Sequence, residues 1–251
     1  MSGTVKRGSA PNDQKEFGDK SIDKLLKAGQ DLQYLLNQGY NIKGASTFVG
    51  NHYLLSERQR LALVRAISSE KNIKIRKSKE ITNISHASVV NIDGYNTIIT
   101  LEVALSDSLL LKSMDGTIRD LAALRGTYRL IDKTETAIML IGKILEKNKV
   151  KKAIFYLDAP VSNSGRLKQR IMEILYPFTF EVQVEVIHNV DSVLEKLDNV
   201  ITSDAIILDK CISWINLNAK IIEQINKDYP YIDFSSCNVF KDNVGFSMST
   251  E

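Results

Sequence analysis

The sequence predicts an α/β fold: a three-layer α/β/α arrangement around a central, mainly parallel sheet of five strands, joined to a small N-terminal α-helical unit. Short β-branched runs alternate with segments that repeat apolar residues at helical spacing, which is typical of βαβ units. Before residue 80 only helical periodicity occurs. Of the 251 residues, 43% are hydrophobic and 25% charged, which excludes collagen-like, mucin-like and wholly disordered proteins.

The N-terminal part is expected to hold a leader and two helices. Residues 1–20 mix Gly, Ser, Pro, Asp and Lys without periodicity, which predicts a disordered leader. From Ile22 apolar residues recur at helical spacing until Gly39, which is well placed to end the first helix. A second helix is expected to begin at Ser56, because Ser56 and Gln59 match the capping-box pattern.

A basic segment divides the chain. Five basic residues between Lys71 and Lys79 interrupt the helical pattern, and a solvated linker is the simplest explanation for such a charge run. We therefore divide the chain into a leader (1–20), an α-helical unit (21–80) and an α/β domain (81–251).

Strands and helices alternate in the α/β domain. Strands are expected at residues 89–92, 153–157, 182–187 and 200–202, with a fifth around 213–216. Helices are expected at residues 132–147, 166–176 and 221–225.

Charge and cysteine content limit the class of function. The 33 Lys and Arg residues exceed the 30 Asp and Glu residues by only three, so any affinity for nucleic acid must come from a local basic face. Cys211 and Cys237 form no CxxC pattern, and with 3 His residues a zinc centre is not expected. The N-terminus is polar and no long apolar run occurs, which favours a cytoplasmic protein with no membrane partner.

Three expected strands end in an aspartate: Asp93, Asp158 and Asp204. The carboxyl ends of parallel strands share one edge of a sheet, and α/β proteins bind ligands there. Converging carboxylates repel one another unless a cation lies between them, and oxygen ligands suit Mg²⁺ or Mn²⁺. The alternative is that each aspartate is an ordinary turn or helix-capping residue.

Other polar residues lie near these strand ends. Asn96 follows Asp93 by three residues, and a serine-rich loop with Ser162, Asn163, Ser164 and Arg166 precedes a helix. Helix N-termini bind anions, although a capped helix start would explain part of this loop.

A segment between the first strand and the 132–147 helix mixes acids and bases. Arg119 and Arg125 suit phosphate, but structural ion pairs with nearby acids are equally open. Glu102, on the helix after the first strand, either faces the same cleft or faces solvent.

These motifs resemble a known superfamily. Asp93-Gly94-Tyr95-Asn96 after a strand, Asp158 after a middle strand and Thr202-Ser203-Asp204 after a later strand are similar to the PIN, NYN and flap-nuclease superfamily. The span from about residue 22 also resembles a prokaryotic family of uncharacterised proteins, in which a helical unit with an "LSERQRLALVRA"-like stretch precedes a PIN-like domain.

The resemblance implies a nuclease that hydrolyses phosphodiesters with Mg²⁺ or Mn²⁺. Its catalytic acids would be Asp93, Asp120, Asp158 and Asp204, and its metal ligands Asp93, Asp158, Asp204 and Glu102. Asp115 and Glu135 compete with Asp120 for the central acid, and Asp120 is preferred because Arg119 and Arg125 flank it. Asp209 lies five residues after Asp204, farther than the second acid of many members, which weakens a two-metal assignment.

The resemblance also implies nucleic acid as the partner, RNA rather than DNA. Arg58 and Arg65 would extend the path of the strand, and a homo-oligomer is left open. The alternative function is a non-catalytic module of the same fold that binds RNA or a nucleotide.

The residues expected to hold the nuclease substrate are Asn96, Arg119, Arg125, Ser162, Asn163, Ser164, Arg166 and Lys168.

Overall fold

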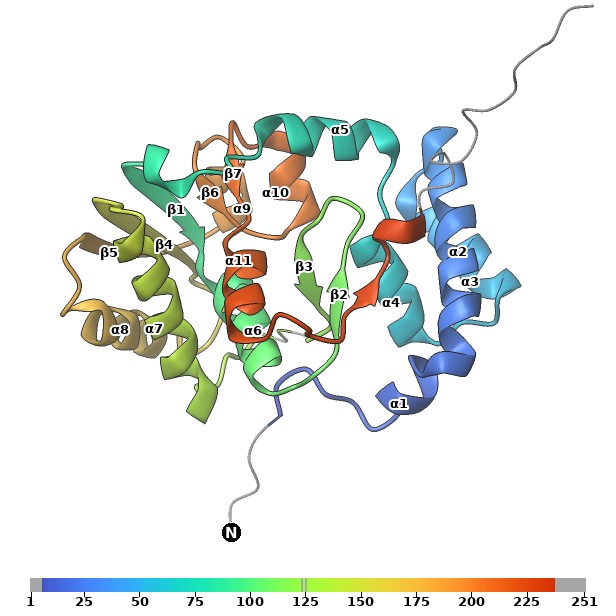
Figure 1. Cartoon of the computed structure of the whole chain (residues 1–251), viewed down its shortest axis with the longest axis horizontal. Coiled ribbons are helices and arrows are strands. Elements are labelled where there is room, and N and C mark those ends of the chain that lie inside the picture. The colour runs from blue at the N-terminus through green and yellow to red at the C-terminus, as the bar shows by residue number, and fades with distance from the viewer. Residues whose placement is uncertain (1–5, 123, 125, 238–251) are drawn as a thin grey trace, which may run out of the picture.

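A central sheet of five parallel strands organises the molecule. The structure is a computed structural model that describes residues 6–122, 124 and 126–237 (Figure 1). The strand order is β5-β4-β1-β6-β7, and every pairing is parallel. The expected five-stranded parallel sheet is therefore confirmed, with the strands β1 (Val89–Asp93), β4 (Lys152–Asp158), β5 (Glu181–Ile187), β6 (Val200–Ile201) and β7 (Trp214–Ile215).

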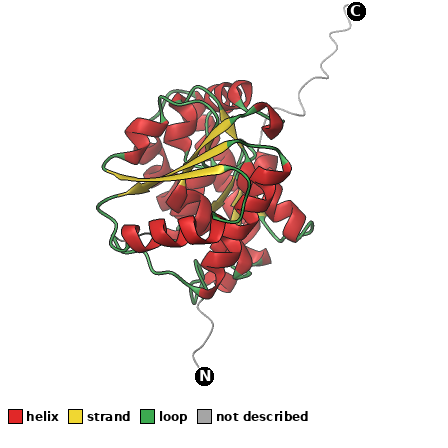
Figure 2. Cartoon of the chain, turned by 90° about the vertical axis from the view of Figure 1, so that its left-hand side faces the viewer, coloured by secondary structure: helices red, strands yellow, loops and turns green. Residues whose placement is uncertain are grey.

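Helices cover both faces of this sheet, as the three-layer prediction requires (Figure 2). One face packs against α6 (Gly94–Leu105), α7 (Asp132–Lys147), α8 (Ser164–Leu175) and α11 (Leu217–Ile225), in a core that includes Phe155. The other face packs against α9 (Val190–Leu194) and α10 (Ala205–Lys210), in a second core around Trp214.

The connections reverse direction at β1. The chain passes from β1 to β4 and β5 on one side, then returns to β6 and β7 on the other. The carboxyl ends of β1 and β6 therefore flank a topological switch point, where open α/β sheets bind ligands.

A second, three-stranded sheet was not expected. It has the order β3-β2-β8, from β2 (Leu110–Lys112), β3 (Ile118–Asp120) and β8 (Ile232–Asp233), and β2 pairs antiparallel with β3. Gly116, with φ of 87°, lies in the turn that joins β2 to β3. These strands are too short to show an alternating pattern in the sequence.

The N-terminal helices share a core with this second sheet. They are α2 (Asp19–Asn37), α3 (Ile42–His52), which was not expected, and α4 (Glu57–Ala66), which begins with the predicted Ser56–Gln59 capping box. Leu25 and Leu63 pack in one cluster with Leu111 and Phe234. Residues from the 81–251 part therefore complete the core of the helical unit. Two short 3-10 helices, η1 (Ile84–His86) and η2 (Ser235–Cys237), complete the described structure.

Residues 6–20 differ from the disordered leader expected over residues 1–20, of which 1–5 lie outside the described residues. They include α1 (Asp13–Glu16) and the start of α2. Arg7 forms a 2.9 Å salt bridge with buried Glu102, and Arg58 forms a 2.5 Å salt bridge with Asp13. Ion pairs and one buried apolar side chain, Phe17, hold this segment, which explains why it shows no hydrophobic periodicity.

The expected linker at Lys71–Lys79 is also wrong. These residues belong to a helix, α5 (Glu70–Lys79), which packs on α10. The Lys79 ammonium donates hydrogen bonds to the carbonyls of Leu208, Asp209 and Cys211 at the end of α10. A cation is favourable at a helix C-terminus. Because polar contacts dock α5, its sequence lacks an apolar stripe.

None of the helices in the described part of the chain combines the length and apolarity needed to cross a membrane. The longest, α2, has 19 residues and presents a polar face beside its buried leucines.

The packing of α7 on α8 generates a test of the fold. A Cβ on Gly142 would lie 2.7 Å from Leu175 Cδ2 and from Phe178 Cζ, and such overpacking costs about 1–3 kcal/mol. Since alanine gains ~1 kcal/mol of helix propensity within α7, Gly142→Ala should lower the free energy of unfolding by up to ~2 kcal/mol. Gly165→Ala is the matched control: it meets open space in a helix and should stabilise by ~0.5–1 kcal/mol. Urea denaturation of both variants checks this, and a more stable Gly142→Ala protein would contradict the α7–α8 packing.

Candidate active site

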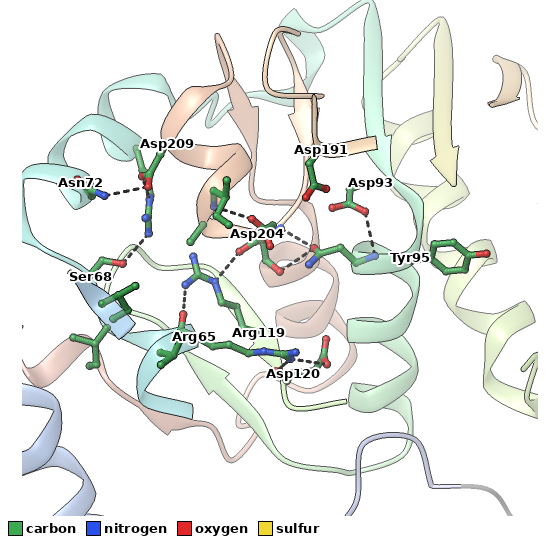
Figure 3. A pocket seen from close by; sticks show the side chains of 18 of the residues that line it. Arg65, Ser68, Asn72, Asp93, Tyr95, Arg119, Asp120, Asp191, Asp204 and Asp209 are labelled. Atoms are coloured by element: carbon green, nitrogen blue, oxygen red, sulfur yellow. Dashed lines mark hydrogen bonds and ion pairs between the residues drawn. The ribbon is translucent and has the colours of Figure 1, made fainter. Parts of the chain in front are cut away.

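A cleft of about 750 Å³ lies between the carboxyl edge of the parallel sheet and the N-terminal helices (Figure 3). One wall comes from the ends of β1, β4 and β6, and the opposite wall from α4, α5 and the segment between them. Its described charged lining consists of six aspartates and three arginines, Asp93, Asp120, Asp158, Asp191, Asp204, Asp209, Arg65, Arg76 and Arg119.

Asp93 is the last residue of β1 and the N-cap of α6. Its Oδ1 accepts a hydrogen bond from the Asn96 N–H at 3.3 Å, and its Oδ2 accepts one from the Thr202 hydroxyl at 2.8 Å. A Cβ on Gly94 would lie 2.6 Å from Leu157 Cδ2 and 3.0 Å from the Tyr156 carbonyl oxygen. Glycine therefore lets α6 start against β4 and places Asp93 at the sheet edge.

Asn96 ties the two sides of the switch point together. Its Oδ1 accepts hydrogen bonds from the Ser203 N–H at 2.8 Å and the Ser203 hydroxyl at 2.9 Å. Asp204, the next residue, caps α10 with Oδ1, which accepts from the Ile206 N–H at 2.7 Å. Asp93, Asn96 and Asp204 therefore lie at one edge of the sheet, each held by hydrogen bonds to the 202–206 segment.

The carboxylates at this edge repel one another. Burial raises the pKa of Asp93 to about 7, and the nearby charges of Asp204 and Asp191 add to that rise, against the hydrogen bonds from Thr202 and Asn96. The pKa of Asp191 is also raised, first by burial and then by Asp204 and Asp158. Among the described residues, Asp93, Asp158, Asp191 and Asp204 form no salt bridge, and we call this group of four the acidic cluster. The charges of Arg119 and Lys210 act on Asp204 and Asp191 without pairing directly with them.

Asp191 was missed by the sequence analysis. It lies in the first turn of α9, four residues after the end of β5. Applying the strand-end argument to β5 as well, and extending it by one helical turn, would have found it.

Asp158 lies at the other end of the acidic cluster. Its Oδ1 accepts a 3.4 Å hydrogen bond from the Val190 N–H. Burial raises the pKa of Tyr95 to about 12, and the charge of Asp158 contributes. Both residues line the cleft, so Asp158 and Tyr95 mark its β4 end.

The donor set suits a hard cation, but the acids do not form a ready-made cage. Within the described residues, no three His, Cys, Asp or Glu side chains lie close enough together to hold a metal ion. Asp93, Asp158 and Asp204 each use an oxygen on a neighbouring N–H. The four carboxylates of the acidic cluster nonetheless supply the oxygen ligands that Mg²⁺ and Mn²⁺ prefer.

Arg119 is occupied by the protein itself. Its Nε donates to the Ser203 carbonyl at 2.7 Å, its Nη2 to Asp115 at 2.6 Å, and its Nη1 to the Arg65 carbonyl. Asp115 also accepts from Arg76 at 2.7 Å, and Arg76 in turn binds Asp209 at 2.6 Å. This network fixes the walls of the cleft, and structural ion pairing, which the sequence left open, describes Arg119.

The competing central acids lie in three different places. Asp120 lines the cleft but is held by Thr100 at 2.7 Å and Arg65 at 3.4 Å, apart from Asp93 and Asp191 in Figure 3. Glu135 binds Arg170 at 2.6 Å on the outer helices. Asp115, as described above, lies within the arginine network.

Glu102 neither joins the metal-ligand set nor faces solvent. It is fully buried and does not line the cleft. It pairs with Arg7 and accepts hydrogen bonds from Tyr128 at 2.5 Å and from Thr134. The structure therefore places Glu102 away from Asp93, with its carboxylate engaged by three side chains, Arg7, Tyr128 and Thr134.

The residues expected to hold substrate do not all meet in the cleft. Asn96 and Arg119 line it, whereas Asn163 and Arg166 line a separate pocket of about 430 Å³. Ser162 pairs through its backbone with the 126–128 segment, Ser164 begins α8, and Lys168 is exposed on that helix. Arg125 lies outside the described residues. Arg58 binds Asp13, and Arg65 lines the cleft.

Comparison with known proteins gives a family without an assigned activity. A family model described as "Domain of unknown function (DUF5616)" matches residues 81–220, and one described as "Protein of unknown function (DUF434)" matches residues 24–79. An uncharacterized protein of Methanocaldococcus jannaschii is 35% identical over 207 residues, which cover 81% of this chain and 99% of that protein. No solved structure matches the chain.

The charge of Asp93 makes stability depend on pH. Since the carboxyl ionises near pH 3.8 in the unfolded chain and near 7 in the metal-free fold, wild-type stability should fall as pH rises through this window. Asp93→Asn removes that penalty, so its gain over wild type should grow between pH 5 and pH 8, towards ~4 kcal/mol at ~1.4 kcal/mol per pKa unit. Thermal denaturation in a chelator measures it.

The control is Asp198→Asn, which changes an exposed aspartate before the start of β6, at the amino end of the sheet. Its difference from wild type should be the same at pH 5 and pH 8. A constant gain for Asp93→Asn over the same range would show that Asp93 carries no buried charge.

Proposed function

The chain belongs to the family described as "Domain of unknown function (DUF5616)", and we propose that it is a metal-dependent nuclease that hydrolyses phosphodiester bonds in RNA. The acidic cluster is the proposed centre. One observation carries the proposal: four aspartates without a salt-bridge partner among the described residues line one cleft at the switch point of a parallel sheet.

A divalent cation is the simplest way to neutralise the negative charge of the acidic cluster. Asp93 and Asp204 would hold Mg²⁺ or Mn²⁺, with Asp158 and Asp191 beside them, since all four carboxylates reach the same cleft. Such an ion supplies a water of lowered pKa and stabilises negative charge on phosphoryl oxygens. Protonation of Asp93, with its pKa near 7, and cation binding are alternative ways to neutralise the same site.

Other residues of the chain orient the acidic cluster and form the walls of the substrate site. Thr202 and the Asn96 N–H orient Asp93, and the Ile206 N–H orients Asp204. Apolar side chains such as Ile67 and Ile99 form part of the wall and exclude water from it. Tyr40, 61% exposed at the rim, offers a ring on which an unpaired base can stack.

The size of the cleft favours a single strand. Its volume of about 750 Å³ is that of a site for a compact ligand, ~300–1,000 Å³. The α4–α5 wall lies opposite the sheet edge, so a short unpaired segment fits where a duplex does not. We choose RNA over DNA because the sequence motifs resemble the PIN, NYN and flap-nuclease superfamily. The strand order of the parallel sheet supports this analogy at the level of the fold.

A non-catalytic RNA- or nucleotide-binding module is the second candidate. It is favoured by the lack of a compact group of three metal-binding side chains within the described residues. It is favoured also by Asp209, whose carboxylate is committed to Arg76 and Asn72 at 2.6 Å and 3.0 Å.

Cleavage assays on single-stranded RNA, duplex RNA and DNA with Mg²⁺ or Mn²⁺ separate the two. Wild type should cleave single-stranded RNA, and Asp93→Asn and Asp204→Asn should each lower the rate more than ~100-fold, because several kcal/mol of charge stabilisation are lost. Binding of RNA in chelator should persist in both variants, since fewer negative charges face the phosphates. Asp198→Asn is the control and should cleave like wild type.

Failure of the nuclease proposal has a clear signature. Purified protein would cleave no RNA or DNA with either metal, yet would bind RNA with equal affinity in metal and in chelator. The binding module would then replace it.

A further inference from the structure

A second pocket, of about 430 Å³, lies where α7 and α8 begin. We call it the arginine pocket. Its lining consists of Arg129, Leu130, Asn163, Arg166, Gln169, Arg170 and Glu173.

Two of its three arginines have no counter-charge. Arg170 is neutralised by Glu135 at 2.6 Å and Glu173 at 3.0 Å. Arg129 and Arg166 are exposed, and neither guanidinium forms an ion pair with any described residue. The pocket therefore presents two guanidinium groups without a salt-bridge partner to a ligand, whereas the amides of Asn163 and Gln169 donate to Tyr128 and Glu173.

The surrounding backbone adds positive potential. α8 follows the carboxyl end of β4, and α7 leads back to the amino end of β4, so both helices start at the carboxyl edge of the sheet. Both are long, with 16 and 12 residues, and their N-terminal dipoles favour an anion.

The pocket is held in place by the backbone around it. The Asn163 amide donates to the Tyr128 carbonyl at 2.8 Å, and the Ser162 N–H donates to the Gly126 carbonyl at 2.9 Å. These bonds clamp the segment that carries Arg129 to the one that carries Arg166. The two arginines are therefore placed by the fold on either side of one hollow.

Short chain segments connect the arginine pocket to the β4 end of the cleft. Tyr128, next to Arg129, packs its ring 5.4 Å from the ring of Tyr95, which lines the cleft. Asp158 of the cleft precedes the loop that carries Asn163. In the cleft, by contrast, Arg76 and Arg119 are buried in ion pairs, which leaves it acidic.

We infer that the arginine pocket is a phosphate-binding subsite in which Arg129 and Arg166 hold a phosphate group of the nucleic acid whose neighbouring segment enters the acidic cleft. The inference rests on the proposed function for the identity of the strand. An acidic cleft needs positive charge beside it to hold a polyanion, and Arg forks match phosphate oxygens.

The test is the salt dependence of binding to a single-stranded RNA in chelator, so that no cleavage is needed. Each phosphate contact on a single strand contributes ~0.7 to the slope of log affinity against log salt. The double variant Arg129→Ala/Arg166→Ala should bind more weakly and, because the two arginines hold one phosphate, reduce the slope by about 0.7. Lys143→Ala/Lys147→Ala removes two exposed charges from the other end of α7 and should leave the slope unchanged.

A second arm identifies the source of the phosphate. RNA with a 5′-phosphate is compared with RNA with a 5′-hydroxyl: an equal loss of slope assigns an internal phosphodiester, and a loss only with the 5′-phosphate assigns a terminal one. Either result supports the subsite. A slope that changes no more than in the lysine control, in protein whose thermal unfolding matches wild type, overturns it.

The two proposals fail separately. If no substrate is cleaved but the arginine variant loses its share of the slope, the subsite stands and the nuclease does not. If RNA is cleaved in an Asp93-dependent manner while the arginine variant matches the lysine control in slope and in KM, the nuclease stands and the subsite does not.

Discussion

A buried ion network joins the helical unit to the parallel sheet, and the cleft exists because of it. Asp115 accepts from Arg76 of α5 at 2.7 Å and from Arg119 of β3 at 2.6 Å. Burial opposes its charge, but the two arginines and Thr117 outweigh that cost and hold the pKa of Asp115 at about 2. Because removing one partner would leave a buried charge unpaired, the three side chains fix the separation of the two walls.

The same network reaches the acidic cluster. Arg119 donates to the carbonyl of Ser203, which lies between Thr202, the hydrogen-bond donor of Asp93, and Asp204. The positions of both aspartates therefore depend on contacts that begin in α5, on the far wall. The helical unit is thus part of the architecture of the site, and a parallel sheet alone would not create this cleft.

Sequence periodicity predicted what apolar packing determines. The five parallel strands and α7, found at Asp132–Lys147 as expected, carry regular apolar patterns. Sequence periodicity did not predict the segments that polar contacts stabilise. Helix α5 packs through contacts of Arg76 and Lys79, and residues 6–20 pack in part through Arg7 and Asp13. Such partners lie 39 to 133 positions away in the sequence, and no local pattern encodes them.

The strand-end rule located Asp93, Asp158 and Asp204 in one cleft, because topology alone brings those ends together. It could not show which charges would be neutralised. Glu102 and Arg119 look like any other charged residue in the sequence, yet each forms a salt bridge inside the protein, with Arg7 and Asp115 respectively. The structure separates the remaining charges by their partners: the four aspartates of the acidic cluster, and Arg129 and Arg166 of the arginine pocket, form no salt bridge with a described residue. On the proposed function, one strand would place a phosphate between Arg129 and Arg166 and a neighbouring segment at the acidic cluster. A bound cation would balance the negative charge that the strand adds there.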